Sequence, residues 1–216
     1  MRARFTLAEI QQQALAIVDR EGLTGLTMRS LAAALGTGPM TLYNYVAGRE
    51  ALEELVVDAV SARVAVPRPT GDWLADTRGI ARVLWSTVRE HPAVVPLMLT
   101  RRTSSADSLA PAEALAAALA RGGLDGPDLL AAFRTVMAFV MGVAQAELAG
   151  PLAPEESPSD AAGRIAALAD GSLPTLARLA SVGVDFAGDE FERGLTFVLA
   201  GIAGAADGKT VERGQP

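Results

Sequence analysis

A short segment that begins at Pro39 and is closed by Gly48 carries uncharged side chains that are well suited to hydrogen bonding. At about 100° per helical residue the segment has an inner side and an outer side. The inner side holds Pro39, Leu42 and Val46, with Tyr43 at its margin, and the outer side holds Met40, Thr41 and Asn44, with Tyr45 at the other margin. Solvent-facing helix sides are normally rich in Lys and Glu. An Asn can bond an adenine edge, Met and Thr methyl groups can touch a thymine methyl, and a Tyr hydroxyl can bond a phosphate, so the outer side suits the major groove of DNA.

The preceding residues predict the first half of a helix-turn-helix. Thr27 can cap a helix in which Leu31 and Leu35 share one face, and Gly36 can supply the left-handed residue that ends it. Pro39 suits the first position of the next helix because it has no amide proton to leave unpaired. A plain helical hairpin in an all-α core is the alternative interpretation of the same spacing.

The run LGTGPMTLYNYVAGREAL resembles the recognition segment of the tetracycline-repressor (TetR) family. The family's Thr-Leu-Tyr, a Val or Phe three residues later and a basic residue opening the next helix correspond to Thr41-Leu42-Tyr43, Val46 and Arg49. The likeness covers Phe5 to about Ala65, and a weaker likeness to the family's ligand-binding domain rests on GLDGPDLLAAFRTVMAFVMG and FERGLTFVLAGI. The resemblance implies a homodimeric transcriptional regulator, usually a repressor that a small ligand releases from a palindromic operator.

The resemblance and the side assignment together predict the DNA-contacting residues. We expect bases to be touched by Pro39, Met40 and Asn44, phosphates to be held by Thr41, Tyr43, Tyr45 and Arg49, and the backbone or a base edge to be met by Thr27 and Arg29. The tetracycline-repressor branch has Gln-Pro in place of Pro39-Met40 and Trp-His in place of Asn44-Tyr45, so a different operator is expected.

Composition narrows the class of protein. Ala and Leu dominate the 216 residues, which favours an all-α fold of about nine to ten helices. A net charge of −6 argues against a nonspecific nucleic-acid coat protein. With no cysteine, one histidine and no Gly-rich phosphate loop, the chain lacks the usual residue sets of an enzyme, a metal site or a cofactor site. We recognise no signal peptide or membrane span and therefore expect a cytoplasmic protein.

Breaks in the pattern divide the chain into four parts. We expect a three-helix DNA-binding domain at 1–48, a connecting helix at 49–66, a C-terminal ligand-binding and dimerisation domain at 67–207, and a disordered tail at 208–216. The linker Pro67-Arg68-Pro69-Thr70-Gly71 marks the main boundary. The helices at 127–148 and 189–206 are assigned to the dimer interface by the resemblance.

A ligand cavity is expected among the helices from Trp73 to Leu148, where the family keeps it. Met, aromatic and amide side chains can shape an adaptable apolar pocket. The candidates are Trp85, Met98, Phe133, Met137, Phe139, Met141 and Gln145, each of which alone could equally be ordinary core. Pro96 stands where the tetracycline repressor has a drug-binding histidine, so no metal-chelated drug is expected. The alternative function is a helical small-molecule-binding protein that does not bind DNA.

Overall fold

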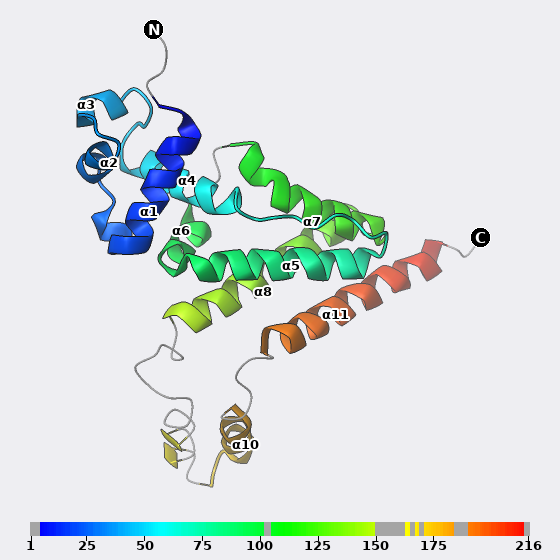
Figure 1. Cartoon of the computed structure of the whole chain (residues 1–216). Helices are drawn as coiled ribbons and strands as arrows, with labels where there is room; N and C mark the ends of the chain where they lie inside the picture. Colours follow the sequence, from blue (N-terminus) through cyan, green and yellow to red (C-terminus); the bar gives the residue numbers. More distant parts are fainter. Residues whose placement is uncertain are drawn as a thin grey trace. The chain divides into compact units, whose positions relative to one another are not determined.

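The computed structural model describes residues 5–101, 105–149, 163–164, 167–168, 171–183 and 190–213, and the ordered elements within these ranges are all helices (Figure 1). This confirms the predicted all-α fold class. The α-helices are α1 (Leu7–Gly25), α2 (Met28–Ala34), α3 (Pro39–Leu42), α4 (Arg49–Ser61), α5 (Trp73–Glu90), α6 (Val95–Thr100), α7 (Ala110–Arg121), α8 (Gly126–Ala149), α10 (Pro174–Gly183) and α11 (Glu190–Arg213). Two 3-10 helices, η1 (Pro92–Val94) and η2 (Asp107–Leu109), precede α6 and α7.

The N-terminal helices begin where local side-chain chemistry predicts. Thr6 and Glu9 form a reciprocal capping box at the start of α1, with the Glu9 carboxylate 2.7 Å from the Thr6 amide nitrogen. Thr27 caps α2 in the same manner through Ser30, whose amide nitrogen lies 3.0 Å from the Thr27 hydroxyl. Gly36 has a φ of 63°, as the predicted turn requires.

Two helices of this region are shorter than the sequence predicted. Pro39 does open α3, but the α-helix ends at Leu42 rather than approaching Gly48. The chain then tightens into a turn, because the Tyr45 amide donates to the carbonyl of Leu42, three residues back, at 2.8 Å. The connecting helix α4 ends at Ser61 rather than extending to residue 66.

An apolar core joins α1 to α4 into what we call the head (Phe5–Ser61). Fully buried side chains from each of the four helices meet there, including Ile10, Leu31, Leu42 and Leu52. The segment formed by η1 and α6 adds Val94 and Leu97 to the same core, although it follows α5 in the chain. The head core therefore includes residues that the sequence assigned to the C-terminal domain.

Helices α5 and α7 pack side by side (Figure 1). Asp72 caps α5 by accepting hydrogen bonds from the amides of Leu74 and Ala75. An ion pair of 2.6 Å connects Arg121 of α7 to the buried Asp76 of α5. Hydrogen bonds from Thr70, and then Arg121, outweigh burial and lower the pKa of Asp76.

The chain forms two compact units, Met1–Phe133 and Arg134–Pro216. This division does not fall at the Pro67–Gly71 linker, because the helices that follow the linker pack within the first unit. In the second unit, a Cβ atom on Gly194 of α11 would lie 2.6 Å from the Phe139 ring of α8. The lack of a side chain at Gly194 thus permits the close approach of α11 to α8.

Helix α11 extends to Arg213 and so includes residues 208–213 of the predicted tail. Residues 214–216, the end of the predicted tail, lie outside the described residues.

Candidate nucleic-acid interface and effector groove

The outer side of α3 is accessible and its inner side is buried. Leu42 is 0% and Val46 2% exposed in the head core, whereas Met40 is 78% exposed. Asn44 is also exposed, and Thr41 is half-buried. These positions confirm the predicted orientation of Leu42, Val46, Met40 and Asn44, and they leave the amide and thioether groups available to a ligand outside the protein.

Three residues at the margins of this segment lie differently from the prediction. Pro39 is exposed rather than packed on the inner side. Tyr43 is 54% exposed, whereas Tyr45 is half-buried and its ring meets that of Phe5 edge to face at a centroid distance of 6.3 Å. The tighter turn after Leu42 changes the angular spacing, so Tyr43 turns outward and Tyr45 turns toward the head core.

Arg49 is engaged within the protein. Its Nε atom lies 2.5 Å from Oε1 of Glu53, and its two terminal nitrogens donate to the carbonyls of Leu26 and Leu23. The guanidinium therefore fastens the start of α4 to the α1–α2 turn. Glu53 is only four residues from Arg49, but the sequence could not show that the carbonyls of Leu26 and Leu23 also lie within reach.

At the start of α2, Thr27 and Arg29 are both exposed. The Thr27 hydroxyl is 3.0 Å from that of Ser30 as part of the helix cap. Thr27 thus positions α2, while the Arg29 side chain projects from its first turn. The DNA-contacting roles of both residues stay predictions.

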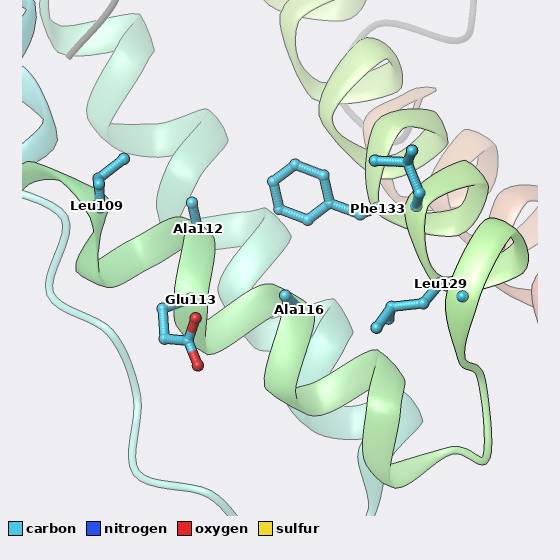
Figure 2. Close-up of a pocket in the computed structure, with 8 residues that line it drawn as sticks. Leu109, Ala112, Glu113, Ala116, Leu129 and Phe133 are labelled. Carbon is cyan, nitrogen blue, oxygen red and sulfur yellow. The ribbon is translucent and has the colours of Figure 1, made fainter.

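A groove of about 410 Å³ lies between α7 and the first turns of α8 (Figure 2). Figure 2 shows the Phe133 ring and Leu129 reaching from α8 toward the small side chains of Ala112 and Ala116 on α7. The groove is lined by Leu109, Ala112, Glu113, Ala116, Gly126, Leu129, Leu130 and Phe133. Alanines four residues apart leave room along one helix face, and this spacing is the signal by which the sequence could have located the groove.

Among the predicted ligand-binding residues, Phe133 is the one that lines this groove. Trp85 lies beneath the guanidinium of Arg89, whose Cζ is 4.5 Å from the ring centroid, and Met98 packs on the head core. Four more, Met137, Phe139, Met141 and Gln145, are on the part of α8 that belongs to the second unit. The assignment of these other residues to a ligand site stays a prediction.

Helices α8 and α11 expose apolar surface. Phe197 of α11 is 77% exposed, and Cβ atoms built on Gly201 and Gly204 would meet no atom within 4 Å. The segment Gly126–Glu147 of α8 has a mean hydropathy of 1.6, long and apolar enough to span a membrane by length and composition, and 28% of it is buried. From the sequence we expected no segment long and apolar enough to span a membrane, and Gly126–Glu147 corrects that expectation. Exposed apolar surface of the kind seen on α8 and α11 is typical of a face that another molecule covers.

Comparisons with known proteins match this architecture. Residues 67–205 match the family model of the tetracyclin repressor-like C-terminal domain. The HTH-type transcriptional repressor DrrR1 of Streptomyces coeruleorubidus is 32% identical over 210 residues, which cover 92% of this chain and 77% of that protein. The crystal structure of apo ActR from Streptomyces coelicolor superposes with a TM-score of 0.83 at 29% identity, covering 97% of this chain and 100% of that one. ActR in complex with actinorhodin gives a TM-score of 0.81 at 29% identity, with coverages of 94% and 99%.

Proposed function

The chain belongs to the tetracycline-repressor (TetR) family of transcriptional regulators, and from this premise we propose that it represses transcription at a palindromic operator from which a small, largely apolar ligand releases it. The observation that carries the proposal is the orientation of α3, with Leu42 and Val46 in the core and Met40 and Asn44 exposed. The proposal places the protein in the cytoplasm, with a regulatory and not a catalytic role.

Base contacts are assigned to the exposed residues of α3. Asn44 can make two hydrogen bonds to an adenine edge, and Met40, with Pro39 beside it, can touch thymine methyl groups. Thr41 and Tyr43 carry hydroxyls that can bond phosphates, and Arg29 can add a charged contact from the start of α2. Tyr45 and Arg49 support this surface through contacts within the chain: Tyr45 packs on Phe5, and Arg49 holds the α1–α2 turn.

Two copies of the chain are needed to read a palindrome. A two-fold dimer presents two recognition segments to successive major grooves, and half-site spacing then selects the operator. We assign the interface to α8 and α11, which expose Phe197 and the glycine strip of Gly201 and Gly204.

The groove between α7 and α8 is the effector site that we propose. Its apolar lining suits an apolar molecule, and a volume of about 410 Å³ lies within the range of small-molecule sites. The structurally similar ActR has been crystallised with actinorhodin and with (S)-DNPA, which makes these two compounds reasonable trial ligands. Phe133→Ala should weaken binding of a trial ligand, whereas Trp85→Phe, outside the groove, should not.

The experiment that tests DNA reading is an operator selection from random duplexes followed by mobility-shift titrations. Asn44→Ala should relax the base preference at one position of each half-site, whereas Tyr43→Phe should weaken binding to all sequences by a similar factor. Leu35, half-buried behind the turn, offers a control, since Leu35→Met preserves volume and should leave the preference unchanged. An Asn44→Ala protein with the full wild-type preference would contradict the proposed orientation on DNA.

A further inference from the structure

The groove between α7 and α8 is built from one stripe of residues on each side. The stripe on the α7 side is Leu109, Ala112, Glu113 and Ala116, and the stripe on α8 is Gly126, Leu129, Leu130 and Phe133. Both sets follow the spacing i, i+3, i+4 and i+7, which places their members on one face of a helix. Glu113 therefore stands on the face of α7 that lines the groove, between Ala112 and Ala116 (Figure 2).

Glu113 brings a negative charge to an otherwise apolar lining. Among the described residues that line the groove it is the one with a charged side chain, and the others are Leu, Ala, Gly and Phe. Its side chain is exposed, and no hydrogen bond or ion pair joins it to another residue in the part of the chain that the structure describes. The carboxylate is therefore available to a molecule that enters the groove.

Helix stability alone does not explain why this acid stands at the groove. Glu113 lies in the first turn of α7, where the helix dipole favours a negative charge. The same turn begins with Ala110, which is exposed and does not line the groove. An acid at residue 110 would gain from the dipole as well, so the dipole does not select the groove face.

We propose that the effector of this groove is a flat apolar molecule with one cationic group, such as a protonated amine, and that Glu113 selects it. The apolar body packs between Phe133 and the two alanines of α7, whose small side chains leave room for a ring. The cationic group then meets the Glu113 carboxylate, whereas a carboxylate in the same place is repelled. Because Glu113 is exposed, its charge sets a preference and the apolar contacts supply most of the affinity. The inference rests on the proposed function for the identity of the groove as the effector site.

Three fluorescent compounds that share one anthracene ring system separate charge from apolar packing. At neutral pH anthracene-methylamine is a cation, anthracene-methanol is neutral and anthracene-carboxylate is an anion. Fluorescence titrations of the full-length protein give a Kd for each compound. The amine should bind about three- to fivefold more tightly than the alcohol, as expected for an exposed ion pair, and the carboxylate should bind most weakly. The preference for the amine should shrink in about 1 M salt, which screens exposed charges.

Variants of Glu113 assign the preference to this residue. Glu113→Gln keeps the size of the side chain and removes its charge, so the amine and the alcohol should bind with equal affinity. Glu113→Lys should reverse the order and make the carboxylate the tightest of the three. The matched control is Glu21→Gln, which removes the same charge from an exposed side chain of α1 that does not line the groove. This control changes the net charge of −6 as much as Glu113→Gln does, and it should keep the wild-type order of affinities.

Two results would overturn the inference and leave the effector site intact. One is equal binding of the three compounds by the wild type, with Phe133→Ala weakening all of them. The other is a preference for the amine that persists in Glu113→Gln or that Glu21→Gln removes to the same extent. If none of the compounds bound, or if Phe133→Ala changed none of their affinities, the proposed effector site itself would be contradicted, and the role of Glu113 with it.

Discussion

Substitutions at Leu42 and Met40 should separate folding from DNA reading, because the two residues are neighbours on opposite sides of α3. Leu42 is 0% exposed, so Leu42→Ala removes fully buried methyl groups from the head core. Such a truncation costs about 2–5 kcal/mol. For a chain of 216 residues, a loss of about 3 kcal/mol lowers Tm by roughly 6–12 °C.

Met40→Ala should do the reverse. With 78% of Met40 exposed, its truncation should change the unfolding free energy by less than about 0.5 kcal/mol. Loss of its contact with a base should cost about 1 kcal/mol at one position, or about fivefold in Kd for the selected operator.

Differential scanning calorimetry gives the Tm of each protein, and titrations with the selected operator and with a duplex changed at one base pair give the affinity and the preference. The expected pattern is a lower Tm for Leu42→Ala with the base preference retained in the folded fraction, and an unchanged Tm for Met40→Ala with a weaker preference. If Met40→Ala lowered the Tm by as much as Leu42→Ala, the assignment of sides to α3 would be wrong.

Three further outcomes follow from other parts of the chain. Burial of Glu53 is outweighed by hydrogen bonds from Arg49 and Arg101, which lower its pKa from the ordinary 4.5, so the ionised carboxylate stabilises the fold above that pH, and this stabilisation is lost as the pH falls through the lowered pKa. Glu53→Gln should therefore reduce the fall in the free energy of unfolding at acid pH, as measured by urea unfolding at a series of pH values. Phe197→Glu should convert the dimer to monomer in analytical ultracentrifugation. Leu179 of α10 is 63% exposed, and Leu179→Glu should leave the dimer intact. Equal dimer affinity of the two variants would exclude α11 from the interface. Gly194→Ala should lower the free energy of unfolding in urea by about 1–3 kcal/mol because its Cβ would overlap the Phe139 ring. Gly201→Ala meets no atom in its own chain and should be tolerated by the isolated subunit. Equal losses for the two variants would refute the close approach of α11 to α8 at Gly194.

Local chemistry made several features predictable from sequence. The caps at Thr6, Thr27 and Asp72 depend on side chains that reach amides two or three residues ahead, and the turn at Gly36 depends on one backbone angle. The alternation of Leu42 and Met40 across α3 follows from helical periodicity over a few residues. These features need no knowledge of tertiary structure.

Tertiary partners decided the features that sequence alone could not show. Arg49 has the charge of a phosphate ligand, but its donors bind the Leu23 carbonyl and Glu53. Met98 has the flexibility of a pocket residue, but the head core covers it. Periodicity identifies that a side chain is buried and cannot say which of two cores buries it, so the ligand residues were the least predictable part of the site.

The shortness of α3 explains why residues that cannot touch DNA should still control its binding. A helix of four residues has almost no stability of its own, so the packing of Leu42 and Val46 and the stack of Tyr45 on Phe5 must hold its shape. These supports leave the choice of bases to the exposed side chains. Damage to a support should therefore weaken binding to all operators equally, whereas a change at Asn44 should alter which operator is preferred. The ratio of affinities for two operators, and not either affinity alone, distinguishes a residue that reads DNA from one that positions the reader.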